Sequence, residues 1–115
     1  MARTFFTVVE TRPYLRDAEK LLSEAERQSV VDLIAADPGC GQLIVVGGGL
    51  RKVRIALAGR GKRGGARVIY FFHNARMPAY LMALFAKNER ADLTAAETNA
   101  LAKICKAIVK EHGER

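Results

Sequence analysis

The sequence predicts an α+β domain: a small, mostly antiparallel twisted sheet with two N-terminal helices and a C-terminal helix. One strand pattern is followed by two helical patterns, then by a run of strand patterns, and last by an amphipathic helix. Consecutive strands favour an antiparallel sheet over a doubly wound parallel one. With 115 residues, 50% of them apolar, we expect residues 1–115 to form a single domain.

The N-terminal third predicts one strand and two helices. Residues 4–9 are rich in aromatic and β-branched side chains, which is typical of a strand. A helix follows with Pro13 near its start, and its apolar residues recur at helical spacing: Leu15, Ala18, Leu21 and Leu22. Ser23 and Glu26 form the capping-box pattern of a second helix. We expect one face of that helix to carry Val30, Leu33 and Ile34, and residues 37–39 to end it.

The central part of the chain predicts four strands. Residues 43–46 are a short apolar run closed by three glycines. In residues 50–57, apolar side chains alternate with Lys52, Arg54 and Ala56, so one face should be buried and the other cationic. Residues 67–73 and 80–85 are two more strand patterns, joined by a turn at 74–78. Residues 58–65 read as a glycine-rich turn.

The C-terminal segment predicts a long amphipathic helix that starts at the Thr94 and Glu97 capping box. Its apolar stripe is Leu101, Ile104, Cys105, Ile108 and Val109, with Lys103, Lys106 and Lys110 on the solvent side. We expect Cys105 to be a buried free thiol, which makes a reducing cytoplasm the default location. Neither the two cysteines nor the two histidines have metal-ligand spacing, so the sequence predicts no metal and no cofactor.

Basic residues dominate residues 38–88, which contain no Asp or Glu. The nine basic residues there are Arg51, Lys52, Arg54, Arg60, Lys62, Arg63, Arg67, Arg76 and Lys87. A field of one sign attracts a polyanion, and phosphate is the first expectation. Lys52 and Arg54 share one face of a strand and Arg67 begins the next strand, so the three should converge. Because this stretch offers no carboxylate to neutralise them, we expect them to await a negative ligand.

Several other functions have weak support in the sequence. Residues 59–64 match G-x-G-x-x-G, but a strand follows them instead of a helix, and Arg63 stands where a P-loop needs Ser or Thr. No apolar run approaches the roughly 20 residues that span a bilayer, so no membrane partner is expected. The chain has no nucleophile elbow. If it is an enzyme, its cationic strands must carry the chemistry.

Three segments resemble bacterial toxins of the RelE/ParE superfamily, most closely the HigB-like branch. They are GGLRKVR at residues 48–54, GKRGGARVIY at 61–70 and LFAKNE at 84–89, and the likeness covers nearly the whole chain. The resemblance implies a RelE-like fold and the toxin of a type II toxin–antitoxin pair, many of which cleave mRNA in the ribosomal decoding site. The implied partners are the ribosome, mRNA and a cognate antitoxin, HigA-like with a helix-turn-helix domain. DNA would be contacted only indirectly, through that antitoxin.

The resemblance also assigns residues. The basic pair on the central strand falls on Lys52 and Arg54, the arginine that starts the next strand on Arg67, and the basic residue after the last strand on Lys87. Asn88 and Thr94 stand where well-known members have an arginine and a tyrosine, and Tyr70 or Tyr80 can be suggested as stand-ins for that tyrosine. The residues expected to hold ribosomal RNA are Arg51, Arg60, Lys62 and Arg63.

These residues would suit a metal-independent endoribonuclease in which the 2′-OH attacks the adjacent phosphorus. Arg54 and Arg67 would stabilise the developing negative charge, and Lys52 or Lys87 would act as the base if neighbouring arginines lower its pKa. Two alternatives stay open: a ParE-like inhibitor of DNA gyrase and a non-catalytic module that binds RNA or the ribosome.

Overall fold

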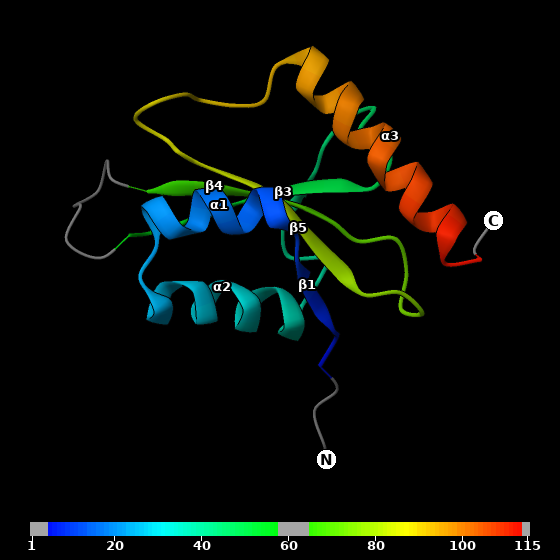
Figure 1. Cartoon of the computed structure of the whole chain (residues 1–115), viewed down its shortest axis with the longest axis horizontal. Coiled ribbons are helices and arrows are strands. Elements are labelled where there is room, and N and C mark those ends of the chain that lie inside the picture. The colour runs from blue at the N-terminus through cyan, green and yellow to red at the C-terminus, as the bar shows by residue number, and fades with distance from the viewer. Residues whose placement is uncertain (1–4, 58–64, 114–115) are drawn as a thin grey trace.

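The computed structural model describes residues 5–57 and 65–113, which form a five-stranded sheet and three helices (Figure 1). The elements are β1 (Val8–Glu10), α1 (Arg12–Leu21), α2 (Glu24–Ala36), β2 (Gln42–Leu43), β3 (Leu50–Ile55), β4 (Ala66–Phe71), β5 (Ala79–Ala86) and α3 (Ala95–Glu111). This order is the one that the sequence predicts, and the α+β fold is confirmed. None of the described helices combines the length and the apolar character needed to cross a membrane.

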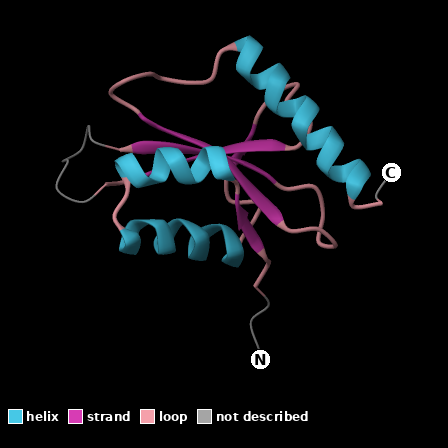
Figure 2. Ribbon diagram, in the orientation of Figure 1, coloured by secondary structure: helices cyan, strands magenta, loops and turns pink. Residues whose placement is uncertain are grey.

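The strands, magenta in Figure 2, form one sheet in the order β1-β5-β4-β3-β2. All neighbours are antiparallel except β1 and β5, which run parallel, so the sheet is mostly antiparallel as predicted. Parallel strands need a long connection between them. The connection from β1 to β5 is long, since it includes α1, α2 and the strands β2 to β4. The central strand β4 is therefore bonded on both sides, to β3 and to β5.

The sheet is the middle of three layers, with α1 and α2 on one face and α3 on the other (Figure 1). The first face packs on Tyr14, Ala18, Val30 and Ile34, and the second face packs on Cys105. Strand β4 contributes to both cores, because its side chains alternate between the two faces. Each fully buried Leu, Ile or Phe contributes about 1.5–3 kcal/mol through removal of apolar surface from water.

Local sequence signals fix the ends of two helices. In α2, the Ser23 hydroxyl accepts from the Glu26 N–H at 3.1 Å while the Glu26 carboxylate accepts from the Ser23 N–H at 2.8 Å. In α3, Thr94 and Glu97 make the same reciprocal pair at 3.1 and 2.8 Å. Both predicted capping boxes are confirmed, and they satisfy N–H groups that a helix start leaves without partners.

Some predicted details are wrong. The first strand begins at Val8, later than expected, and the strand predicted at residues 43–46 is reduced to Gln42–Leu43. Val46 lies in the left-handed region with φ 53°, so the backbone turns away from the sheet there. Leu33 is 39% exposed, because the buried stripe of α2 is the narrow pair Val30 and Ile34, four residues apart. The turn predicted at residues 58–65 lies almost wholly outside the described residues.

Candidate functional site

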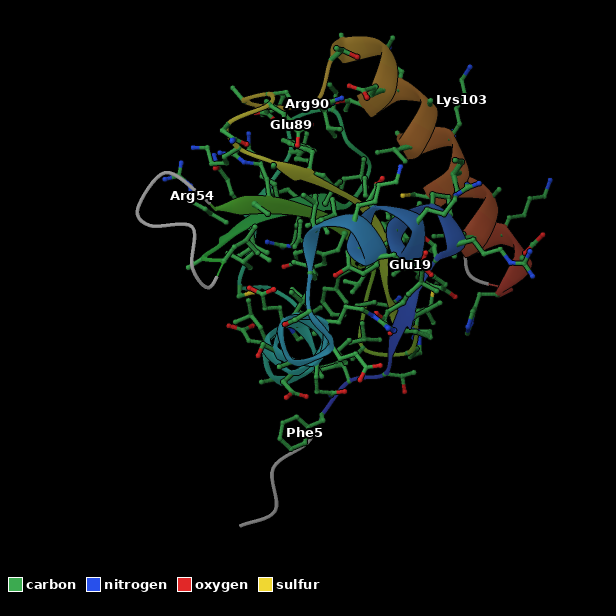
Figure 3. All side chains as sticks on the ribbon, turned by 60° about the vertical axis from the view of Figure 1, so that its left-hand side comes forward. Phe5, Glu19, Arg54, Glu89, Arg90 and Lys103 are labelled. Carbon is green, nitrogen blue, oxygen red and sulfur yellow. The ribbon has the colours of Figure 1, made fainter. Side chains whose placement is uncertain are left out.

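The α3 face of the sheet changes from apolar to cationic along β3. Leu50, Lys52 and Arg54 share this face by alternation, since Leu50 belongs to the core under α3 while Val53 and Ile55 pack on the other face. Leu50 is fully buried, whereas Arg54 is exposed. Figure 3 shows Arg54 at the end of the sheet remote from Lys103 of α3, on the side of the connection that carries Glu89 and Arg90.

Arg67 lies directly across from Arg54, because the two residues are register partners in the antiparallel β3–β4 pair. Opposite residues of such a pair project from the same face, with Cβ atoms about 4.5–5.5 Å apart. Like charges in this arrangement destabilise a sheet unless an anion lies between them. The sheet thus brings Lys52, Arg54 and Arg67 together on one face.

Lys87 joins this group from the neighbouring strand. It follows the end of β5, where Ala86 pairs with Ala66, and its N–H donates to the Gly65 carbonyl at 3.0 Å. The pKa of Lys87 is lowered, first by partial burial and then by the positive charges of Arg54 and Arg67. All four side chains that the sequence suggested for catalysis therefore gather at one end of the sheet. We call Lys52, Arg54, Arg67 and Lys87 the cationic cluster.

A carboxylate lies in the cationic cluster, contrary to the expectation that nothing neutralises these charges. Asp92 belongs to the connection between β5 and α3, and its Oδ2 lies 2.6 Å from Lys52 Nζ and 3.6 Å from Arg67 Nη1. The hydrogen bond from Lys52 is the first cause of a lowered Asp92 pKa, followed by the Leu93 N–H and Arg67. The sequence prediction failed because Asp92 lies outside the acid-free stretch, and only the fold brings it to β3.

Parts of the cluster keep unused hydrogen-bonding capacity. The Nε of Arg67 is buried and has no hydrogen-bond partner within the described residues, and the side chain as a whole is 14% exposed. Arg54 makes no ion pair with any described residue. A buried donor without a partner costs free energy, so this arrangement favours an added acceptor. Phosphate oxygens are acceptors of the right charge.

A comparison with protein families identifies the chain. The model of the RelE toxin of the RelE/RelB toxin–antitoxin system matches residues 15–115. The chain belongs to the RelE toxin family. The match runs from within α1 to the C-terminus, so it includes the whole cationic cluster and Asp92. Membership of a toxin–antitoxin family implies a cognate antitoxin as partner.

The RNA-binding residues expected in this RelE toxin do not all lie beside the cluster. Arg51 points to the opposite face of β3, where its Nη1 donates to the carbonyls of Gly41 at 2.8 Å and Gly39 at 3.4 Å. Its guanidinium thus holds the loop before β2. The other three expected residues, Arg60, Lys62 and Arg63, lie outside the described residues. An RNA-binding role for these four residues stays untested, and the bonds of Arg51 to the loop carbonyls favour a structural role for that one.

Neither tyrosine suggested as a stand-in lies at the cluster of this RelE toxin. Tyr70 is fully buried, and its hydroxyl donates to the Pro38 carbonyl at 2.7 Å and accepts from the Gly41 N–H at 2.8 Å. Tyr80 pairs with Phe71 at the other end of β5, six residues or about 20 Å from Ala86. The suggestion is wrong because tyrosines in so small a sheet serve the core.

Proposed function

We propose that this RelE toxin is a ribosome-dependent endoribonuclease of the HigB-like branch that cleaves mRNA and so inhibits translation. Toxins of the family are generally mRNA-cleaving endoribonucleases. The observation that supports the proposal for this chain is the cationic cluster, four basic side chains on one open end of the sheet. The ribosome and mRNA would be its partners, and the cytoplasm its place of action.

The proposed reaction needs no group beyond the protein and the RNA. The 2′-OH attacks the adjacent phosphorus while a base removes its proton, and the bond from phosphorus to the 5′ oxygen breaks. The products are a 2′,3′-cyclic phosphate and a 5′-OH end, which takes a proton from an acid. Positive charge beside the phosphorane stabilises the transition state more than the ground state.

The surroundings of each side chain support a division of roles. Lys87, whose pKa is lowered, is the proposed base. Arg54 and Arg67 are always charged and are the proposed clamp on the phosphate oxygens. The ammonium of Lys52 is the proposed proton donor to the leaving 5′ oxygen. Because no described histidine lies in the cluster, we expect in-line placement of mRNA by the ribosome to supply several kcal/mol of the barrier reduction.

Replacement of Arg67 tests the proposal. Arg67→Ala should abolish growth arrest on induction and remove new mRNA ends that carry a cyclic phosphate or a 5′-OH. The matched control is Arg16→Ala, an exposed arginine on α1, which should stay toxic. Thermal melting checks that both variants fold. If Arg67→Ala arrests growth and cuts mRNA as the parent does, the assignment of the site is wrong.

The same experiment separates the two alternatives. DNA-damage signalling with intact mRNA would favour a ParE-like inhibitor of gyrase. Ribosome binding with unchanged transcripts would favour a non-catalytic RNA-binding module.

We also propose how the antitoxin acts on this face. A HigA-like antitoxin with a helix-turn-helix domain would cover the cationic cluster with acidic residues and would alone contact DNA. Its complex with the toxin should then weaken with salt and with charge reversal at Arg54. A complex indifferent to both would count against this form of masking.

A further inference from the structure

Asp92 takes up the position between two cations that an anionic ligand would need. A single oxygen, Oδ2, contacts Lys52 Nζ at 2.6 Å and lies within ion-pair distance of Arg67 Nη1, at 3.6 Å. Charge-assisted contacts of this kind are the ones that lysine and arginine make to phosphate oxygens. In the free protein, the carboxylate therefore makes contacts with Lys52 and Arg67 that a phosphate ligand would otherwise make.

We propose that Asp92 is a resident anion that competes with RNA: the scissile phosphate displaces its carboxylate from Lys52 and Arg67. This proposal rests on the proposed function, since it describes how the same site is kept closed to a phosphate. It makes the Asp92 side chain the moving part of the site.

The position of Asp92 in the chain permits such an exchange. It lies outside both β5 and α3, and its side chain is 44% exposed. Apart from its contacts with the two cations, the carboxylate has one further hydrogen bond within the described residues, and it is local: the Leu93 N–H donates to Oδ1 at 2.8 Å. Helix α3 does not depend on Asp92, because its first turn is capped by Thr94 and Glu97. The carboxylate can thus move without unwinding the helix.

A phosphate makes more contacts in the cluster than the carboxylate does. Within the described residues, Asp92 leaves Arg54, Lys87 and the buried Nε of Arg67 without an acceptor. A phosphate group can present several oxygens to these donors. A phosphate oxygen that contacts both Lys52 and Arg67 would take the position of Asp92 Oδ2. Two like charges at 4 Å also repel, by about 1 kcal/mol in water and about 4 kcal/mol near a protein surface. Binding of the phosphate to these two cations therefore displaces the carboxylate.

The test measures binding of a fluorescent RNA oligomer whose 2′-OH groups are replaced by 2′-O-methyl groups, so that it cannot be cleaved. Asp92→Asn keeps the shape of the side chain and its bond to Leu93 but removes the charge. We expect it to bind the oligomer about tenfold more tightly than the wild type. The control is Glu89→Gln, which removes the same charge from an exposed position three residues earlier and should leave affinity within about twofold.

The salt dependence of RNA affinity is a second test of the proposal. In the wild type, RNA displaces a built-in anion at Lys52 and Arg67, whereas in Asp92→Asn it must displace a salt ion. The slope of log affinity against log salt should therefore steepen by about one in Asp92→Asn and stay unchanged in Glu89→Gln.

The outcomes distinguish this proposal from the proposed function. If Asp92→Asn binds no tighter, or more weakly, while Arg67→Ala loses affinity, the resident-anion proposal is overturned and the RNA site stands. If neither variant alters binding, the site itself is wrong. If Asp92→Asn does not fold, inorganic phosphate is titrated into the wild type. The Leu93 amide resonance should then shift in step with that of Arg67 Nε, and an unmoved Leu93 resonance would overturn the proposal.

Discussion

At the scale of single residues, the two lysines of the cluster differ in their surroundings. The Lys52 ammonium donates to a carboxylate, whereas Lys87 lies near Arg54 and Arg67, which with partial burial lower its pKa. A base must be neutral when it accepts a proton, so the lysine with the lowered pKa is better suited to the task. The choice between the two lysines, which the sequence leaves open, thus favours Lys87.

This choice predicts a pH dependence. The cleavage rate should rise about tenfold per pH unit while Lys87 is protonated, and should level off once the pH passes its pKa, below the ordinary lysine value of 10.5. Lys87→Arg keeps the positive charge but cannot supply a neutral base, so we expect a rate loss of about 100-fold or more with RNA binding retained. Single-turnover cleavage from pH 6 to about 9.5 measures both effects.

The control for this prediction is Lys103→Arg, an exposed lysine on α3 at a distance from the cluster (Figure 3). It should keep the wild-type rate and the wild-type pH profile. If Lys87→Arg keeps a rising profile, the base is a different group, and Lys52 becomes the next candidate.

Part of the candidate site could be predicted from the sequence, for a physical reason. The alternation of side chains in a strand places Lys52 and Arg54 on one face, and antiparallel pairing across a turn places Arg67 beside them. Asp92 could not be found in this way, because its contact with Lys52 spans 40 residues. Nor could the hydrogen bonds of the Tyr70 hydroxyl, because they join β4 to the loop at Pro38 and Gly41.

At the scale of elements, the start of α3 is held by an ion pair as well as by its cap. Arg90 donates to both carboxylate oxygens of Glu97, with Nη1 and Oε2 3.0 Å apart, and its guanidinium lies 4.6 Å from the centre of the Phe85 ring. Arg90 and the Thr94 N–H lower the pKa of Glu97 to about 2. This arrangement fixes the connection that carries Asp92 to the end of β5.

The lowered pKa predicts how stability varies with pH. Glu97 has its ordinary pKa of 4.5 when the chain is unfolded, so the unfolded state binds more protons between pH 4.5 and about 2. The contribution of the charge is complete above pH 4.5 and is lost as the pH falls to about 2. Glu97→Gln should lower the free energy of unfolding by about 0.5–1 kcal/mol at pH 7, since the pair is partly exposed, and by almost nothing near pH 2.

Urea unfolding of wild type and variant across this pH range measures the difference. Glu111→Gln, an exposed change at the other end of α3, serves as the control and should show no such convergence. A deficit in Glu97→Gln that is constant with pH would mean that its charge is not what stabilises the helix start.

Elements with local signals could be predicted, and those set by packing could not. The capping boxes of α2 and α3 depend on residues three apart, so their pattern is visible in the chain. Residues 43–46 have the composition of a strand, yet Val45 and Val46 are 84% and 81% exposed. The three glycines that follow hold the turn close to the core: a Cβ at Gly49 would lie 2.7 Å from the Phe71 ring. Tertiary contact thus overrides strand propensity there.

At the scale of the whole molecule, the basic residues of β3 are divided between the two faces of the sheet. The formal net charge of +7 attracts RNA from any direction, but among the described β3 side chains those beside the cluster are on the α3 face. Arg54 belongs to that face and has no ion-pair partner among the described residues, whereas Arg51 bonds the Gly41 carbonyl on the other face. Because both lie on β3, three residues apart, they are a matched pair for measuring which face binds RNA.

We predict that Arg54→Gln and Arg51→Gln have different effects, although both remove one positive charge. Arg54→Gln should reduce the slope of log affinity against log salt by about one, because one phosphate contact is lost. Arg51→Gln should leave that slope unchanged and lower the free energy of unfolding by about 1 kcal/mol, because the loop carbonyls lose their donor. Titrations at several salt concentrations, with thermal melts of the same samples, measure both. If Arg51→Gln reduces the slope as much as Arg54→Gln does, RNA contacts both faces of β3, and one open face cannot explain the site.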